Sequence, residues 1–326
     1  MVTAARDFEV VYIAGSGRSG STLVERTLGA LPGWVNVGEL IQLFRDPTLV
    51  EERCGCGESF STCPLWSEVG RRAYGSWPPD VLKRLGHLQG RVSRQRHLPR
   101  LLALRSGSRS KLAGLCHEYA EHYLRIARAV TEVSGARVLV DASKWPGQAL
   151  ALARGGVPVR LVHQIRDPRG VAHSWSKSDV VRPHGRAGSL MASRSPLASA
   201  VRWTALQAEI ETASRTFRQR AVLRYEDFVV HPSATVARAV ADLGLELEAG
   251  ALDFMGGTDV NLPQSHGLAG NPSRFQVGRI SLRADEAWRL SMDRRTQRTV
   301  TMATAPLLVR YGYPFVPSHR PNAVES

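Results

Sequence analysis

The sequence lacks long apolar runs. Charged residues such as Glu132 and Asp141 interrupt even the most apolar region, 130–150. No segment approaches the roughly 20 apolar residues that a membrane-spanning helix needs. The first 15 residues also lack the charged, apolar and small segments of a signal peptide. We therefore predict a chain with no transmembrane segment and a cytoplasmic location.

Cysteine is scarce, with four in 326 residues. Cys54, Cys56 and Cys63 are close in the sequence, whereas Cys116 stands apart. A disulfide framework is not expected in a reducing compartment. The three neighbouring thiols could bind zinc if Cys116 or His117 supplied a fourth ligand. Because C-x-C-x6-C is not a standard zinc spacing, we predict that the thiols pack in the core or form an occasional disulfide, and that no metal is bound.

Acidic residues are outnumbered. The chain has 43 Lys and Arg against 29 Asp and Glu, a net charge of +14. Such an excess favours polyanionic partners, namely nucleic acid, anionic lipid or a multiply phosphorylated nucleotide. The basic residues are spread along the whole chain and are not interleaved with aromatic residues. No helix-turn-helix, RNA-recognition or zinc-finger pattern occurs, so we predict no nucleic-acid binding.

Short apolar segments rich in β-branched residues alternate with helical patterns along the chain. The expected strands are 10–14, 35–37, 138–140, 159–165 and 221–224. Strands that alternate with helices indicate parallel β-α-β units, so we predict an α/β fold, a P-loop-like doubly wound parallel sheet flanked by helices. Because no linker divides the chain, we expect one domain, 1–326, with insertions at 45–110 and 179–195.

The loop at 15–22, GSGRSGST, lies between the first strand and the first helix. Backbone N–H groups and a helix N-terminus form an anion site at such a position. The nucleotide-triphosphate pattern G-x-x-x-x-G-K-[ST] fits except at its lysine, which is Ser21 here. Arg18 is the only cation of the loop. The loop therefore has the backbone of a phosphate-binding loop, but its positive charge lies in the middle of the loop and not at the lysine position.

This loop resembles the 5′-phosphosulfate loop of sulfotransferases that use 3′-phosphoadenosine 5′-phosphosulfate (PAPS). The resemblance is closest to the branch that includes protein-tyrosine sulfotransferases and many bacterial enzymes. The matching residues are Arg18, Ser19, Gly20, Ser21, Thr22 and Leu23. The resemblance implies that Arg18 contacts the phosphosulfate near the scissile bond, while the hydroxyls and backbone amides hold the 5′-phosphate. The implied reaction transfers a sulfonate group to a hydroxyl, releases adenosine 3′,5′-bisphosphate and requires no metal.

A second anion site is expected after the strand 159–165. Arg166 ends this strand, and Ser174 follows eight residues later. The resemblance implies that both contact the 3′-phosphate. The chemistry agrees, because a guanidinium presents a planar fork to a phosphate and a serine in the next helix can return to the same place. The alternative is that Arg166 only pairs with Asp167 or another nearby acid.

Two later segments extend the resemblance. Tyr225 stands in R-Y-E-D-F, which is similar to the R-Y-E-D-L segment whose tyrosine contacts the nucleotide. The segment 270–275, G-N-P-S-R-F, is similar to a loop that covers the nucleotide in bacterial members. Asn271 and Arg274 would then contact the 3′-phosphate or the adenine. A plain surface turn is the alternative for this last segment.

Sulfonate transfer is an in-line displacement that needs a base and several cations. Glu39 lies 21 residues after Arg18, which is the spacing of the catalytic base in the tyrosine sulfotransferase branch. A carboxylate favoured by a helix N-terminus is the alternative for Glu39, and His163 and His173 are the next candidate bases. Lys144 resembles a family lysine that neutralises the sulfonate or the bridging oxygen, although it could also be a solvated loop lysine.

The acceptor is left open by the resemblance, which is thin across 65–130 and 179–220. It would be a small molecule, glycan, lipid or peptide that bears a hydroxyl. The competing function is a P-loop kinase that acts on a small molecule with ATP and Mg²⁺. The missing lysine disfavours it, and Asp141 is the nearest candidate for its metal-binding acid.

Overall fold

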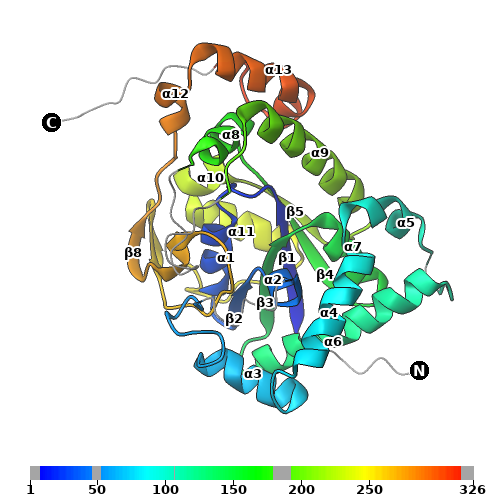
Figure 1. The fold of residues 1–326 in the computed structure, drawn as a ribbon. Helices are drawn as coiled ribbons and strands as arrows, with labels where there is room; N and C mark the ends of the chain where they lie inside the picture. Colours follow the sequence, from blue (N-terminus) through cyan, green and yellow to red (C-terminus); the bar gives the residue numbers. More distant parts are fainter. Residues whose placement is uncertain (1–7, 46–52, 106, 179–191, 317–326) are drawn as a thin grey trace.

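Five short apolar segments form one parallel sheet in the computed structural model, which describes residues 8–45, 53–105, 107–178 and 192–316 (Figure 1). The strand order is β2-β3-β1-β4-β5, and every neighbouring pair is parallel. The strands are β1 (Glu9–Gly15), β2 (Trp34–Gly38), β3 (Val138–Lys144), β4 (Val159–Ile165) and β5 (Arg220–Arg224). They overlap the five segments expected to be strands, so the predicted α/β fold is confirmed.

Helices cover both faces of this sheet, with α1, α10 and α11 on one side and α4, α6 and α7 on the other (Figure 1). In chain order the helices are α1 (Ser21–Gly29), α2 (Ile41–Arg45), α3 (Pro64–Tyr74), α4 (Pro79–Val92), η2 (Gln95–His97), α5 (Leu98–Ala103), α6 (Lys111–Ser134), α7 (Pro146–Arg154), α8 (Pro168–Ser176), α9 (Pro196–Ser214), α10 (Tyr225–Val230), α11 (Pro232–Asp242), η3 (Pro272–Phe275), α12 (Ala287–Ser291) and α13 (Arg294–Arg310). Within the described part of the chain, no helix is both long enough and apolar enough to cross a membrane.

The central strand β1 buries side chains on both faces. Val11 and Ile13 pack in the cluster that contains α1, α10 and α11, whereas Val10 and Tyr12 pack in the cluster that contains α3, α4, α6 and α7. Successive side chains of a strand point to opposite faces, so a continuous apolar run suits a strand that is covered on both sides. The helices of the expected insertion 45–110 thus share a core with the sheet. The other expected insertion, 179–195, lies outside the described residues except for 192–195.

The strand order reverses direction at β1. The chain places β3 and β2 on one side of β1 and β4 and β5 on the other. In an open parallel sheet such a switch point leaves a crevice beyond the carboxyl ends of the strands, where ligands bind. The loops after β1, β3 and β4 therefore meet at one place.

A small antiparallel sheet, which the sequence did not predict, follows the main fold. It consists of β6 (Met255–Gly256), β7 (Asp259–Leu262) and β8 (Gly278–Ser281). The connection between β7 and β8 returns to the main sheet, where the N–H of Leu268 donates to the carbonyl of Val37 at 2.9 Å and the N–H of Glu39 donates to the carbonyl of Leu268 at 2.8 Å. We call residues 263–277 the β7–β8 connection.

Candidate active site

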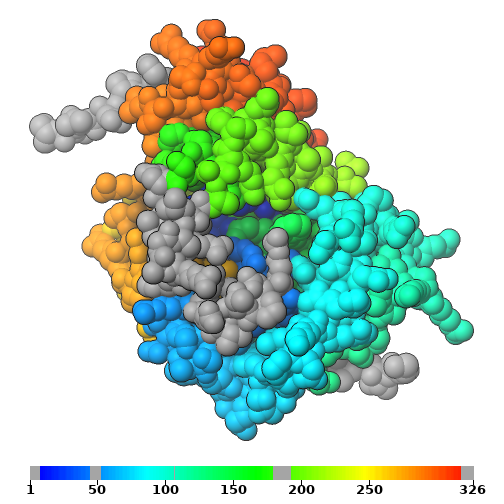
Figure 2. All heavy atoms as spheres, in the orientation of Figure 1, coloured from blue at the N-terminus to red at the C-terminus, as the bar shows by residue number. Residues whose placement is uncertain are grey.

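A cavity of about 570 Å³ opens at the carboxyl ends of the central strands. Figure 2 shows the molecule hollowed between the green residues of α9 and the cyan residues of the helices that precede α6. Twelve of the thirteen predicted site residues line this cavity: Arg18, Gly20, Ser21, Thr22, Leu23, Glu39, Lys144, Arg166, Ser174, Tyr225, Asn271 and Arg274. Ser19 is the exception, because its side chain is fully buried behind the loop, where Gln164 Nε2 donates to its carbonyl at 2.8 Å.

The loop after β1 has an unusual backbone that leads directly into α1. Arg18 and Gly20 have φ angles of 67° and 83°, in the left-handed region. A side chain at Gly20 would lie 2.5 Å from the ring of Tyr225, so both the backbone and the space require glycine. Among the described residues no side chain caps α1. The N–H groups of its first turn, at the end of the helix that lies on the cavity, therefore have no side-chain acceptor. This arrangement suits an anion.

Arg166 links the strand β4 to this loop. Its Nη1 donates to the carbonyl of Arg18 at 2.9 Å, and its Nη2 donates to Asp285 Oδ2 at 2.9 Å. The guanidinium also lies over the ring of Tyr225, 4.6 Å from the centroid. Asp167, the partner considered from the sequence, instead pairs with Arg169 at 2.7 Å. Arg166 does have an acidic neighbour, but it is Asp285, which the sequence did not indicate.

Glu39 and Lys144 both line the cavity and form an ion pair. Each side chain is only 14% exposed. Glu39 Oε2 also accepts a hydrogen bond of 3.1 Å from Gln42 Nε2. Lys144 has a φ of 71°, a strained value for a residue with a side chain. Gly38 has a φ of 74°, and any side chain there would collide with the backbone of Leu268. The backbone at Lys144 and directly before Glu39 is thus held in conformations that few residues adopt.

The two histidines considered as bases lie elsewhere. His163 is buried in β4, where its Nε2 forms a hydrogen bond of 2.5 Å with Gln207 Oε1, and burial lowers its pKa. Burial also lowers the pKa of His173, which lies on α8. Neither lines the cavity, and in the described ranges Glu39 and Asp285 are its only acidic or histidine side chains. Of these two carboxylates, Glu39 pairs with Lys144 and Asp285 pairs with Arg166.

The cavity wall is strongly positive. In the described part of the chain its cations are Arg18, Lys144, Arg166, Arg194, Arg202 and Arg274, against the two carboxylates of Glu39 and Asp285. Burial lowers the pKa of Arg18. Such a wall attracts a polyanion. The sequence had indicated neither Arg194 nor Arg202, because they lie on or before α9 and match no motif.

An aromatic residue that the sequence reading missed supports this wall. Trp175 Nε1 donates to the carbonyl of Gly17 at 3.2 Å. Arg194 lies over the indole, 3.8 Å from its ring centroid, and Arg18 lies 5.2 Å from it. The indole thus connects the loop after β1 with the residues that precede α9.

The β7–β8 connection lies against α1. The N–H of Asn271 donates to Thr22 Oγ1 at 3.1 Å, and Arg274 Nη1 donates to the carbonyl of Gly270 at 3.1 Å. Arg26 of α1 donates to the carbonyls of Ser273 and Pro263, at 2.7 and 3.0 Å. Hydrogen bonds to α1 therefore hold the segment that carries Asn271 and Arg274 beside the cavity, so it is not a free surface turn.

Asp141, the candidate metal-binding acid of a kinase, does not line the cavity. Its carboxylate is fully buried and accepts hydrogen bonds from Tyr123 Oη at 3.0 Å and from the N–H of Ser143 at 2.9 Å. Burial raises its pKa to about 6. Ser143 Oγ in turn accepts from the N–H of Ile41 at 2.9 Å. Asp141 therefore fixes the end of β3 beside α2, which leaves the kinase function without its metal-binding acid at this position.

Comparisons with known proteins identify the family. Residues 11–249 match the model of the sulfotransferase family. The chain belongs to that family. Its fold is similar to the sulfotransferase domain of the olefin synthase from Synechococcus PCC 7002, with a TM-score of 0.51 and 19% identity over 97% of this chain and 99% of that one.

A second similar structure is the sulfotransferase domain from the curacin biosynthetic pathway. Its TM-score is 0.51 and its identity 14%, over 96% of this chain and all of that one. No curated protein sequence gives a significant match. The family match supports sulfonate transfer, and the two structures support the fold.

Proposed function

We propose that this protein transfers a sulfonate group from PAPS to the hydroxyl of an acceptor. The observation that carries the proposal is that one cavity is lined both by the loop 15–22 at the start of α1 and by Arg166 and Ser174, the two groups of residues that we assign to two phosphates. Arg166 is bonded to the carbonyl of Arg18, so the two groups are adjacent. A nucleotide with separate 5′ and 3′ phosphates matches such a cavity, and both charges would meet a positive wall.

Each part of the nucleotide has a proposed partner. The loop 15–22 and the first turn of α1 would hold the 5′-phosphate, and Arg166 and Ser174 the 3′-phosphate. Tyr225 contacts Arg166 and closes over Gly20, so it would pack against the nucleotide between the two phosphates. Asn271 and Arg274 line the same cavity and would cover the nucleotide.

The transfer step uses Glu39, Lys144 and Arg18. The acceptor oxygen attacks the sulfur and forms a new S–O bond while its proton passes to Glu39. The S–O bond to the 5′-phosphate breaks, and its electron pair remains on the phosphate, which leaves as part of adenosine 3′,5′-bisphosphate. Lys144 and Arg18 would stabilise the charge that develops on the sulfonate and the leaving oxygen. The donor is already activated, so the step itself needs no metal.

The acceptor would enter on the side of the cavity formed by α2, η2 and α9. Gln42, Gln95, Ser199, Trp203 and Leu206 line this side, a mixture of amides, a hydroxyl and apolar surface. Such a wall suits an acceptor with both a hydroxyl and an apolar body.

The cytoplasmic location stays a prediction from the sequence.

Ligand-induced thermal stabilisation tests the proposed nucleotide. The protein is heated with adenosine 3′,5′-bisphosphate, AMP or ATP, each with and without Mg²⁺. We expect the bisphosphate to stabilise the fold without metal, by about 3 kcal/mol at 100-fold over its dissociation constant, and AMP at the same concentration to stabilise it much less. Equal stabilisation by AMP would remove the 3′-phosphate site, and stabilisation only by ATP with Mg²⁺ would favour the kinase.

A further inference from the structure

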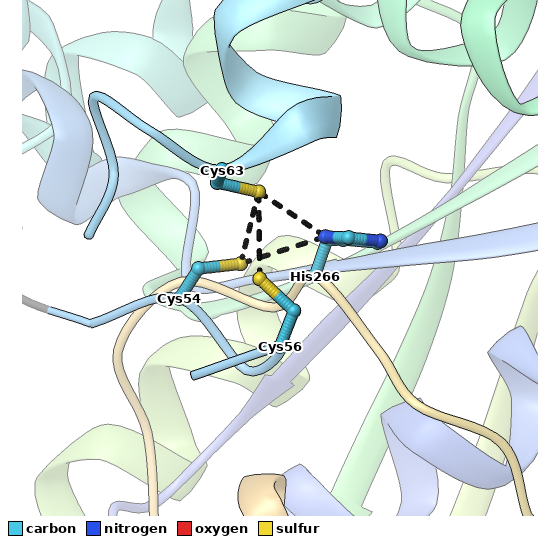
Figure 3. A group of neighbouring side chains, drawn as sticks. All are labelled: Cys54, Cys56, Cys63 and His266. Carbon is cyan, nitrogen blue, oxygen red and sulfur yellow. Dashed lines mark hydrogen bonds between the residues drawn. The ribbon is translucent and has the colours of Figure 1, made fainter. Parts of the chain in front are cut away.

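Three cysteines and one histidine meet at a single point outside the cavity (Figure 3). Cys54 and Cys56 lie in the turn that precedes α3, Cys63 lies at the N-terminus of α3, and His266 lies in the β7–β8 connection. One ligand atom from each residue lies within 4.8 Å of the other three. None of these four residues lines the cavity described above.

The distances match those of a tetrahedral site. Cys63 Sγ lies 3.5 Å from Cys54 Sγ and 3.7 Å from Cys56 Sγ. His266 Nδ1 lies 3.2 Å from Cys63 Sγ and 3.8 Å from Cys54 Sγ. A tetrahedron built from ordinary Zn–S and Zn–N bonds has S···S edges of about 3.8 Å and S···N edges of about 3.6 Å. A disulfide requires about 2.05 Å between sulfurs, and the four cysteines of the chain are free thiols.

We propose that Cys54, Cys56, Cys63 and His266 bind one zinc ion in a closed structural site. Three thiolates and one imidazole are a ligand set that zinc prefers, and four protein ligands leave no open position. Cys54 and Cys63 are fully buried. The shell around the ligands is ordered: Trp66 Nε1 donates to the carbonyl of His266 at 2.8 Å, and the N–H of Cys54 donates to the carbonyl of Glu58 at 2.8 Å. Such contacts orient the ligands before the metal arrives.

The site replaces the prediction that no metal is bound. That prediction rested on the unusual spacing of the three cysteines. It considered only Cys116 and His117 as the fourth ligand. Both candidates lie on α6, outside the cluster: Cys116 is buried in the core, and His117 Nε2 contacts Glu121 at 3.2 Å. The fourth ligand is His266 instead, 203 residues after Cys63, where no local spacing rule could find it.

The ion would tie two distant segments together beside the cavity. The N–H of Gly55 already donates to the carbonyl of Gly267 at 3.1 Å, and Arg274 Nη2 donates to the carbonyl of Arg53 at 3.3 Å. Two residues after His266, Leu268 pairs with the end of β2. A zinc ion at His266 would thus fix the β7–β8 connection against the turn 54–63. Because the ligands come from two segments that lie far apart in the sequence, metal binding should contribute to folding.

Elemental analysis of the full chain tests this site. The protein is produced in zinc-supplemented medium and purified with a reductant and without chelators. We expect about one zinc per chain, and a loss to background in His266→Ala and in Cys63→Ser. Cys116→Ser is the matched control, a buried thiol outside the cluster, and should keep its zinc. His266→Cys should also retain the metal, because four thiolates form an equivalent site.

Two measurements on the wild-type chain keep the proposal testable if the variants do not fold. Cobalt added to the metal-free protein should give the intense visible bands of tetrahedral thiolate coordination. Without reductant, the denatured, metal-stripped chain should contain four titratable thiols. A wild-type chain that holds no zinc and gives no such bands with cobalt would overturn the proposal, and so would two missing thiols together with a disulfide between cluster cysteines.

Discussion

Replacing Glu39 with glutamine separates proton transfer from the other roles of this position. Glutamine keeps the shape of the side chain and can still bond to Gln42, but it cannot accept the proton of the acceptor. The ion pair with Lys144 is also lost, which leaves an ammonium that is only 14% exposed and lines the cavity. A polyanionic nucleotide should therefore bind the variant as well as the wild type or more tightly.

The expected loss is in the chemical step. A positioned general base contributes roughly 10²- to 10⁴-fold, or about 3 to 5 kcal/mol of transition-state stabilisation. Single-turnover transfer of sulfur-35 from labelled PAPS to a phenolic test acceptor measures it directly. Glu132→Gln on α6, an exposed glutamate outside the cavity, is the matched control and should react at the wild-type rate.

Near-normal transfer by Glu39→Gln, with the control unchanged, would refute the reasoning. Glu39 would then only hold Lys144 in place, and Asp285 would become the remaining acid of the cavity to test. A variant that lost nucleotide affinity instead of turnover would also contradict the account, since the lost charge is negative and the ligand is an anion.

Three further changes probe the support of the site. Gly20→Ala puts a side chain 2.5 Å from the Tyr225 ring at a φ of 83°, so the free energy of unfolding in urea should fall by about 1 to 3 kcal/mol; an unchanged value would contradict the close packing. Burial raises the pKa of Glu25 from 4.5 to about 8. The native state therefore holds a proton that the unfolded chain releases, and the stability that this proton brings is complete below pH 4.5 and lost as the pH rises through 8. Between pH 5 and 9 the free energy of unfolding should fall more for the wild type than for Glu25→Gln. Equal losses in the two proteins would contradict the raised pKa of Glu25. Asp285→Asn removes a negative charge beside Arg166, so calorimetry should show tighter binding of adenosine 3′,5′-bisphosphate; weaker binding would mean that the carboxylate orients Arg166.

The main sheet could be predicted because its strands are short, apolar and bounded by polar loops. In a parallel sheet the carboxyl ends of neighbouring strands lie together, so Arg18, Lys144 and Arg166, which follow or end three of the predicted strands, meet at one edge although they are far apart in the sequence. The structure places all three on one cavity. The small sheet β6–β8 was missed, because strands of two to four residues are too short to show a period.

The partners of the site residues could not be predicted. Asp285 lies 119 residues after Arg166, and Arg26 of α1 clamps carbonyls more than 230 residues later. His266 joins the cysteines in the same way. Each of these contacts depends on how the β7–β8 connection and the segment after it fold back onto α1, β4 and the turn 54–63. A single sequence carries no spacing signal for such contacts.

The proposed 3′-phosphate site can be tested most directly by a binding cycle with Arg166→Ala. Calorimetry gives the affinities of both proteins for adenosine 3′,5′-bisphosphate and for AMP, which lacks the 3′-phosphate. Hydrogen bonds to a charged group contribute about 1.5 to 3 kcal/mol, so the variant should bind the bisphosphate roughly 10- to 100-fold more weakly and bind AMP almost as the wild type does. Equal losses for both ligands would contradict the account, because Arg166 would then only support the loop through its bond to Arg18.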